Sequence, residues 1–370
     1  MIIKQITKYL EEWAPKEVAW EKDNVGLQIG DMKNKISNIL LALDLDTKVV
    51  EQAKRKKCNL IITHHPFIFT PLKKLNFNNN KKARLIKDLI LNNISLYSAH
   101  TNLDYTKNGV SFELAKRLGL KNIRFLEHQA SNQYKLVVFV PEKNIDTVSN
   151  AIFNAGGGII GEYSKCSTKN PVEGTFEGSE KTNPFIGNPN TFETVSEIRL
   201  EVLVDSWKLD DVVAAMKYAH PYEEPAFDIL VLKNKNLNYG TGAIGELPQK
   251  TSEKEFLSIV KTSLKANGIR YSSGKNKGIK RVAVCGGTCS DYTNSAIINN
   301  ADAFITADVK YHTFQDAEGK IMLVDAGHYE TEVHVLLPLK KELENFIKKN
   351  NGDIKVFKYS GNGNPVKFFN

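Results

Sequence analysis

Short apolar runs alternate with an amphipathic segment in two stretches that lie far apart in the chain. Residues 38–43 and 60–62 are apolar enough for buried strands, and residues 47–57 between them have helical spacing. The same order returns later in the chain, at residues 281–285, 295–300 and 303–306. A strand, a helix and a second strand predict a βαβ unit with parallel strands. The pattern therefore predicts an α/β fold with two related lobes.

The spacing of the two units supports a common plan. Ile39 and Thr63 are separated by the same number of residues as Val282 and Thr306. A further apolar run follows each unit, at residues 95–98 and 321–324. We interpret the two lobes as products of a duplication. Chance similarity between two common βαβ units is the alternative that the sequence leaves open.

A third region separates the two lobes. It contains predicted strands and helices in the order β-α-β…β-α-β, which is ferredoxin-like, at residues 134–140, 145–154, 197–204, 207–218 and 227–232. Residues 170–195, rich in Gly, Asn, Pro and Thr, predict a long loop. We expect a first lobe at 1–127, an inserted α+β domain at 128–236, and a second lobe at 237–370 that completes one metal-binding domain with the first.

Histidines and acids follow the predicted strands of both lobes. His64 and His65 end the run at 60–62, and the pair His100/Asp104 has the same spacing as the pair His328/Glu332. Imidazole suits Zn, Fe, Ni or Cu, and carboxylate widens the choice to Mn or Mg. A bridging carboxylate can hold two cations about 3.5–4 Å apart. The predicted ligands are His64, His65, Asp104, His328 and Glu332.

Each candidate also has an ordinary structural explanation, because a single histidine is more often a satisfied core or surface residue than a ligand. Adjacent residues on an extended strand point to opposite faces, so His64 and His65 can share a site only if the backbone turns there. We expect His100 to orient Asp104 or the substrate, with ligation as the alternative. His312 is either a proton shuttle or a strand cap. Cys285 and Cys289 are expected to pack in the core.

Composition narrows the range of functions. The chain carries 50 Lys and Arg against 42 Asp and Glu, and residues 128–237 hold an excess of acids, so the lobes are basic. The lysines are scattered without interleaved aromatic residues, which makes nucleic-acid binding the weaker interpretation. Four cysteines indicate a reducing environment, and we see neither a signal peptide nor an apolar run long enough for a membrane helix. We expect a cytoplasmic protein.

Several motifs occur in an order that resembles the Nif-three-like dinuclear metal-centre family, whose members are widely called GTP cyclohydrolase 1 type 2 homologues. These motifs are residues 24–31, 63–66, 98–104, 305–312 and 327–332, so the resemblance covers almost the whole chain. Residues 220–225, His-Pro-Tyr-Glu-Glu-Pro, resemble a segment of the longer bacterial members, whose insert is similar to the trimeric PII and CutA domains.

The resemblance implies a ligand set and an assembly. It places two divalent ions (Zn, Fe or Mn) on His64, His65, Asp104, His328 and Glu332, with Glu332 as the bridge. It also implies a toroidal homohexamer, a trimer of dimers, in which the inserts trimerise.

The expected function is that of a dinuclear metal-dependent hydrolase. Metal-bound hydroxide would attack a nucleotide or related heterocycle, GTP being the substrate that the resemblance implies. His100 or His312 would move protons. The alternative is a metal-stabilised ring that senses a small ligand without turnover.

Overall fold

The computed structural model describes residues 1–275 and 277–369 and divides the chain into two compact units. One unit joins residues 1–127 to residues 239–370, and the other holds residues 128–238. Among the described residues, no helix combines the length and the apolar character needed to cross a membrane. Single 3-10 turns occur at Lys16–Val18, Glu142–Asn144, Ser206–Lys208, Ser290–Tyr292 and Val333–Val335.

The first sheet of the larger unit has the strand order β1-β4-β3-β2-β15. These strands are β1 (Gly26–Ile29), β2 (Asn38–Ala42), β3 (Leu60–Thr63), β4 (Ser95–Ser98) and β15 (Lys355–Lys358). All pairings are parallel except that of β1 with β4. The chain therefore returns from its C-terminal part to complete the sheet that its N-terminal part begins.

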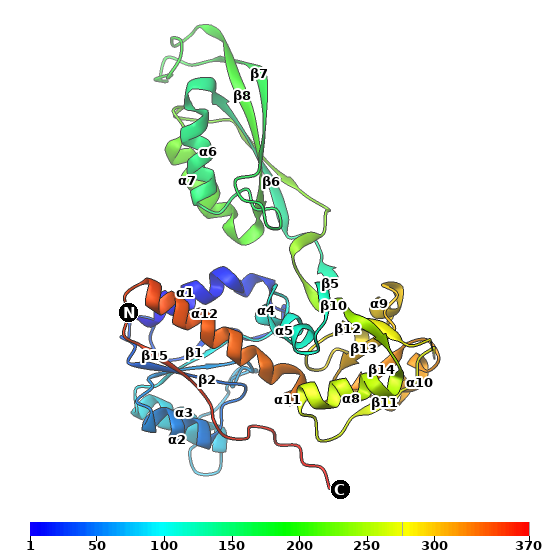
Figure 1. The fold of residues 1–370 in the computed structure, drawn as a ribbon. Helices are drawn as coiled ribbons and strands as arrows, with labels where there is room; N and C mark the ends of the chain where they lie inside the picture. Colours follow the sequence, from blue (N-terminus) through cyan, green and yellow to red (C-terminus); the bar gives the residue numbers. More distant parts are fainter. Residues whose placement is uncertain (276, 370) are drawn as a thin grey trace. The chain divides into compact units, whose positions relative to one another are not determined.

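Helices cover both faces of this sheet (Figure 1). Apolar side chains of α1 (Ile3–Trp13) and α12 (Leu336–Lys349) pack on one face, where Leu41 and Ile62 point. Side chains of α2 (Thr47–Arg55) and α3 (Lys81–Leu91) pack on the other, where Leu40 and Ile61 point. Burial on both faces explains why the central strands are continuous apolar runs.

The second sheet has the order β11-β14-β13-β12-β10-β5. Its strands are β5 (Lys121–Gln129), β10 (Asn236–Thr251), β11 (Arg270–Ser272), β12 (Ile279–Val284), β13 (Ala303–Thr306) and β14 (Met322–Asp325). Strands β12, β13 and β14 are parallel, as are β2, β3 and β4. The helices of this lobe are α5 (Val110–Arg117), α8 (Glu253–Leu264), α9 (Thr293–Ile298) and α10 (Tyr311–Ala317).

The parallel pairs predicted from the apolar runs are present in both lobes. Ile39 lies opposite Leu60 in the first sheet, and Val282 lies opposite Ala303 in the second. Because the strands of each parallel set run the same way, their carboxyl ends lie along one edge of each sheet. The histidines and acids that follow these strands therefore start from neighbouring positions.

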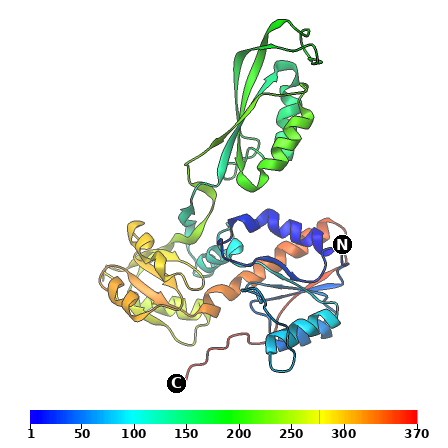
Figure 2. The same cartoon turned by 180° about the vertical axis from the view of Figure 1, so that it is seen from behind.

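The smaller unit is an antiparallel sheet with two helices on one face (Figure 2). The strands are β6 (Gln133–Pro141), β7 (Ser167–Glu177), β8 (Phe192–Asp205) and β9 (Phe227–Val231), in the order β7-β8-β6-β9. Helices α6 (Ile145–Asn154) and α7 (Leu209–Ala219) bury Val148, Ile152, Val212 and Met216 against it.

The predicted loop at 170–195 is wrong at both of its ends, because residues 170–177 belong to β7 and residues 192–195 to β8. Strand β7 pairs with β8 from Ser167 to Glu177, and only residues 178–191 connect the two strands. Val172, Gly174 and Phe176 are partly buried, whereas Glu173, Thr175 and Glu177 are exposed. This alternation has the period of a strand, but Gly, Pro and Asn in the same stretch hide it.

Candidate metal centre

The first lobe contributes two adjacent histidines at the end of β3. The backbone N–H groups of His64 and His65 donate to the carbonyl oxygens of Ala42 and Leu43, at 3.2 and 2.9 Å, so the pairing of β3 with β2 continues past Thr63. The Thr63 hydroxyl then donates to the His65 carbonyl oxygen at 2.9 Å and closes a turn. The two imidazole rings consequently gather, with centroids 5.0 Å apart, instead of pointing to opposite faces.

The second lobe contributes a histidine and a carboxylate on a short helix. Strand β14 ends at Asp325, and Gly327, with φ of +93°, leads into α11 (His328–Glu332). One helical turn separates His328 from Glu332, so both face the same side. Glu332 Oε2 lies 3.2 Å from His328 Nε2 and 2.9 Å from His65 Nε2. The carboxylate of one lobe therefore meets an imidazole of each lobe.

Helix α4 (Thr101–Asp104), which follows β4, completes the group. Asp104 Oδ1 lies 3.6 Å from His64 Nε2, and Glu332 Oε1 lies 3.9 Å from the same nitrogen. The His100 ring stands edge-on to those of His64 and His65, at 5.2 and 5.6 Å. Two sets of potential ligands share His65, namely His64/His65/His100 and His65/His328/Glu332, and within each set the donor atoms lie within 4.8 Å of one another.

The space around the Glu332 carboxylate suits a ligand that contacts more than one group. Glu332 is 3% exposed, and a Cβ added to Gly287 would lie 2.2 Å from its Oε1 atom. Glycine at this position, with φ of +70°, leaves room for the carboxylate. In the described part of the chain, His64 Nε2 and Asp104 Oδ1 are buried without a hydrogen-bond partner. Buried polar atoms of this kind need a partner, and a divalent cation between them would supply one.

Each imidazole of the group is oriented by an acceptor on the nitrogen that faces away. The acceptors are the Ala99 carbonyl oxygen for His64 (2.8 Å), Asp44 for His65 (2.8 Å), Asp23 for His100 (2.9 Å) and Asp308 for His328 (2.6 Å). Such partners fix the tautomer and the ring plane of metal-binding histidines. No sequence pattern assigned Asp23, Asp44 or Asp308 to these histidines. The position of Asp44 directly after the apolar run at 38–43 was the available signal.

Burial and charged neighbours together decide the protonation of His64, Asp104 and Glu332. Burial, reinforced by the neighbouring histidines, lowers the pKa of His64 to about 3, so the ring is neutral, which is the form that binds a metal. Burial and the Glu332 charge raise the pKa of Asp104 to about 7. Burial also opposes ionisation of Glu332, but its histidine partners outweigh burial and hold its pKa well below its usual range.

The two histidines that flank Glu332 have raised pKa values, in contrast to His64. Burial lowers the pKa of His65, but hydrogen bonds with Asp44 and Glu332 outweigh it and raise the pKa to about 10. Hydrogen bonds with Glu332 and Asp308 likewise overcome burial and raise the pKa of His328 to about 9. Protons on these rings hold the cluster together, and a cation that binds the same nitrogens must displace them.

Two residues for which the sequence suggested chemistry lie in different settings. His100 is part of the cluster, half-buried between Asp23 and the other rings. His312 is exposed on α10, where its ring contacts Tyr311 and its Nδ1 atom lies 3.4 Å from Gln315 Oε1. The sets of potential ligands found among the described residues do not include His312, Cys285 or Cys289.

A cavity of about 400 Å³ opens on the second-lobe side of the cluster. His65, His328 and Asp308 lie on its wall, and Arg270 and Phe368 line it as well. Arg270 donates to the Val309 carbonyl oxygen at 3.1 Å and forms an ion pair with Asp325, while its side chain stays 63% exposed. The size is within the range of small-molecule sites, and the wall combines a flat ring with a guanidinium group.

Comparison with known proteins gives one consistent result. The Duf34/NIF3 (NGG1p interacting factor 3) family model matches residues 1–365. A GTP cyclohydrolase 1 type 2 homolog of Halalkalibacterium halodurans is 38% identical over 366 residues, which cover 98% of each chain. The Bacillus subtilis protein of the same name is 34% identical over 367 residues, 99% of this chain and 98% of the relative. The crystal structure of a Bacillus cereus protein related to NIF3 superposes with a TM-score of 0.88 at 34% identity, covering 100% of this chain and 99% of that one. The chain therefore belongs to the DUF34/NIF3 family.

Proposed function

We propose that this protein is a dinuclear metal-dependent hydrolase, similar to GTP cyclohydrolase 1 type 2, acting on a nucleotide or related heterocycle. The observation that carries the proposal is the convergence of His64, His65, Asp104, His328 and Glu332 from three strand ends on one cluster of donor atoms. The donor set suits two divalent ions such as Zn, Fe or Mn. When bound, such ions supply Lewis acidity and lower the pKa of a coordinated water toward neutrality.

The protein's own side chains supply the remaining functions. Glu332, between imidazoles of both lobes, is the proposed bridging ligand. His100, oriented by Asp23, is placed to move a proton at the edge of the cluster. We also propose that His312 takes part in proton transfer. Because its side chain is exposed, mutation can test this role. Asp44, Asp23 and Asp308 keep the rings aligned.

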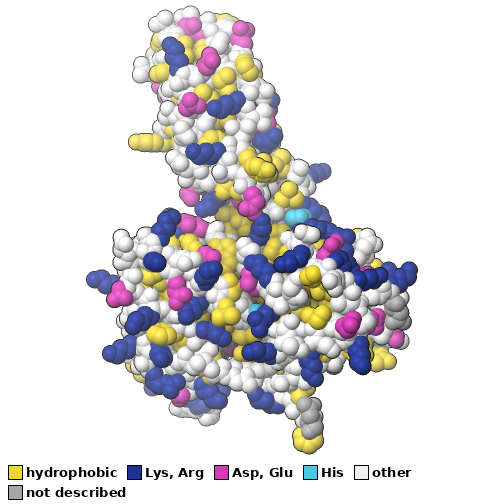
Figure 3. Space-filling view, in the orientation of Figure 1, with side chains coloured by type: hydrophobic (Ala, Val, Ile, Leu, Met, Phe, Trp, Pro, Cys, Tyr) yellow, Lys and Arg dark blue, Asp and Glu magenta, His cyan; other side chains and the backbone are white. Residues whose placement is uncertain are grey.

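The nucleotide part of the proposal rests on the cavity beside the cluster and on charge. Arg270 and Phe368 offer a guanidinium for a phosphate and a ring for a base. Figure 3 shows Lys and Arg side chains spread over the visible face of the larger unit, which would attract a polyanionic substrate. The printed names of the relatives, GTP cyclohydrolase 1 type 2 homologs, point to GTP as the substrate to test first.

Assembly and location are part of the same proposal. The strand order β7-β8-β6-β9 supports a PII/CutA-like smaller unit, and we propose that it trimerises within a toroidal homohexamer. Cytoplasmic location remains our expectation from the few cysteines.

The deciding experiment incubates the purified protein, loaded in turn with zinc, iron and manganese, with GTP and resolves the products by mass spectrometry. His64→Ala and Glu332→Gln are compared with Glu344→Gln, which alters an exposed carboxylate on α12. We expect formate and a ring-opened or pterin product from wild type and Glu344→Gln only, with light scattering showing one oligomeric state for all. If wild type leaves GTP intact with every metal, the GTP assignment fails, and a metal-stabilised ring without turnover becomes the better account.

A further inference from the structure

The smaller unit contains a cavity of about 640 Å³ between the β7–β8 hairpin and residues 222–226. We call it the acidic pocket, because five glutamates are among its lining residues: Glu173, Glu177, Glu197, Glu223 and Glu224. Glu173 and Glu177 lie on the exposed face of β7. Its lining residues, all of them within the described chain, include no Lys or Arg. A concave site with one sign of charge concentrates ions of the opposite sign.

Glu197 distinguishes this pocket from a solvated acidic surface. It lies on β8 and is 8% exposed, whereas the other four carboxylates are exposed. Strand β7 makes room for it, because a Cβ on Gly174 would lie 2.4 Å from Glu197 Oε2. Arg199, two residues further along β8, is paired with Glu201 instead. Among the described residues Glu197 forms no ion pair, and its near neighbour is the neutral phenol of Tyr222. A buried carboxylate without a cationic partner is costly, so the site favours a cation from outside the chain.

Three aromatic side chains, Phe176, Phe185 and Tyr222, also line the acidic pocket. The Tyr222 ring lies 6.5 Å from that of Phe176 and 6.3 Å from that of Phe185, tilted against each by 55° and 52°. His220, which is buried, accepts from the Tyr222 backbone N–H at 3.1 Å and donates to the Phe139 carbonyl oxygen at 2.9 Å, so the wall is anchored. Burial, and then the Glu197 carboxylate, raise the pKa of the Tyr222 phenol, which keeps it neutral. Ring faces attract organic cations more effectively than small hydrated ones.

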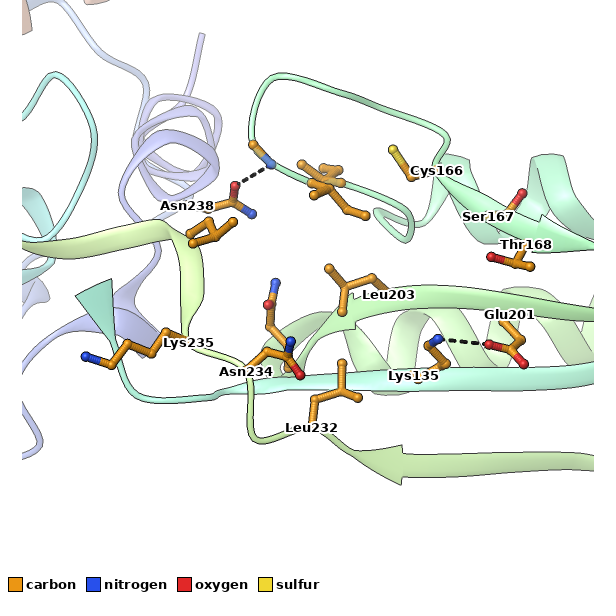
Figure 4. A pocket seen from close by; sticks show the side chains of 15 residues that line it. Lys135, Cys166, Ser167, Thr168, Glu201, Leu203, Leu232, Asn234, Lys235 and Asn238 are labelled. Carbon is orange, nitrogen blue, oxygen red and sulfur yellow. Dashed lines mark hydrogen bonds and ion pairs between the residues drawn. The ribbon is translucent and has the colours of Figure 1, made fainter. Parts of the chain in front are cut away.

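A second cavity of the same unit provides an internal contrast. It measures about 540 Å³ and is lined by Lys135 and Glu201, whose side chains form an ion pair at 2.8 Å (Figure 4). Lys235 also lines it. The lining of this cavity therefore carries two lysines and one carboxylate, with no excess of acids. The two cavities therefore differ in the charge of their lining residues, which decides whether a cation is attracted. They are similar in size and share strand β8.

We propose that the acidic pocket binds a small organic ammonium ion, with Glu197 as its counter-ion and Phe176, Phe185 and Tyr222 as the rings that surround its methylene or methyl groups. This site is independent of the metal centre. A primary polyamine and a quaternary ammonium ion are the two forms of ligand that the carboxylates and rings can accept.

The test uses isothermal titration calorimetry on the full chain at about 0.15 M salt, which screens non-specific attraction. The probes are spermidine, choline and Mg²⁺, with glutamate as the anionic control. Glu197→Gln removes the charge but keeps the shape, and Glu201→Gln makes the same change in the other cavity. We expect an ammonium probe to bind wild type and Glu201→Gln equally, and Glu197→Gln at least about tenfold more weakly.

Folding is controlled by thermal unfolding of each variant. Glu197→Gln removes a buried charge that has no ion-pair partner among the described residues, so it should unfold no earlier than wild type without ligand and should lose the stabilisation that the ammonium probe gives to wild type. Phe185→Ala, which truncates a ring that is 56% exposed, should weaken choline binding without affecting folding. The proposal is overturned if neither ammonium probe binds, if either binds Glu197→Gln as tightly as wild type, or if only Mg²⁺ binds in a Glu197-dependent way.

Discussion

The two lobes of the larger unit share a strand plan but use equivalent positions differently. His65 follows β3 in the first lobe, and Asp308 stands at the same distance beyond β13 in the second. His65 turns its Nε2 atom toward Glu332, whereas Asp308 accepts from the Nδ1 atom of His328. The same position therefore holds a proposed metal ligand, His65, in the first lobe. In the second lobe it holds Asp308, which orients the ligand His328.

A second pair of positions shows the same division. Asp44 follows β2 and accepts from His65, and its counterpart after β12 is Gly287, which leaves space for Glu332. In the first lobe Asp44 orients the His65 imidazole. In the second lobe Gly287, which has no side chain, leaves room for the Glu332 carboxylate. A repeated backbone with unlike side chains therefore builds one asymmetric centre instead of two symmetric ones.

The largest effect should come from Glu332→Gln, which removes the carboxylate that meets both lobes. Metal affinity should fall by at least about 100-fold, because the charge between His65 and His328 is lost along with a ligand. Metal content after dialysis, measured by mass spectrometry, checks this, with Glu344→Gln as the control. Retention of two ions per chain in Glu332→Gln would contradict the role of Glu332 as the bridging ligand.

Metal binding should release protons and tighten as the pH rises. The pKa of His65 is raised to about 10 and that of His328 to about 9, so both rings are protonated at pH 7 in the metal-free protein. Binding displaces these protons, and affinity should rise by up to about tenfold per proton for each pH unit between pH 6 and 8. Calorimetry in two buffers of different ionisation enthalpy counts the protons. No release, or weaker binding at higher pH, would contradict the assigned ligands.

Gly287→Ala should damage the second-lobe side of the centre. A methyl group there meets Glu332 Oε1, so we expect at least about a tenfold loss of metal affinity, together with roughly 1–2 kcal/mol of stability from the left-handed backbone. Gly319→Ala is the matched control, because Gly319 has a similar φ of +73° and no atom within 4 Å of an added Cβ. Equal losses of metal affinity in the two variants would mean that backbone strain, and not the carboxylate, is responsible.

Asp44→Asn and Asp308→Asn compare the two supporting acids directly. Each should lower metal affinity by about 10–100-fold, because the histidine that it orients becomes less basic and less fixed. Asparagine tolerates the left-handed backbone of Asp308, with φ of 54°, so folding should be retained. Competition with a coloured chelator measures both affinities. If only one variant is affected, the two lobes do not support their histidines in the same way.

The smallest effect on the metals should come from His312→Ala. The ring is exposed and contacts Tyr311 and Gln315, so metal content should be unchanged and stability should stay within about 0.5 kcal/mol of wild type. A role in proton transfer would lower kcat without changing KM. Loss of metal from this variant would contradict the ligand set.

Sequence pattern was sufficient where structure is local. The apolar runs at 38–43 and 281–285 predict buried parallel strands, and the His-x-x-x-acid spacing predicts that His328 and Glu332 share a helical face. Patterns were insufficient where partners are distant in the chain. Nothing in residues 355–358 indicates pairing with β2, and the hairpin of β7 is disguised by Gly, Asn and Pro. The acids Asp44 and Asp308 lie 21 and 20 residues from the histidines that they orient, so only the fold reveals their role.

The most direct test of a centre shared by both lobes is anomalous X-ray diffraction from crystals of the metal-loaded protein. We expect metal peaks about 2.0–2.2 Å from nitrogen and oxygen ligands, with Glu332 contacting ions that are also bound by histidines of the first lobe. Peaks confined to one lobe, or located away from His64, His65 and His328, would contradict this account.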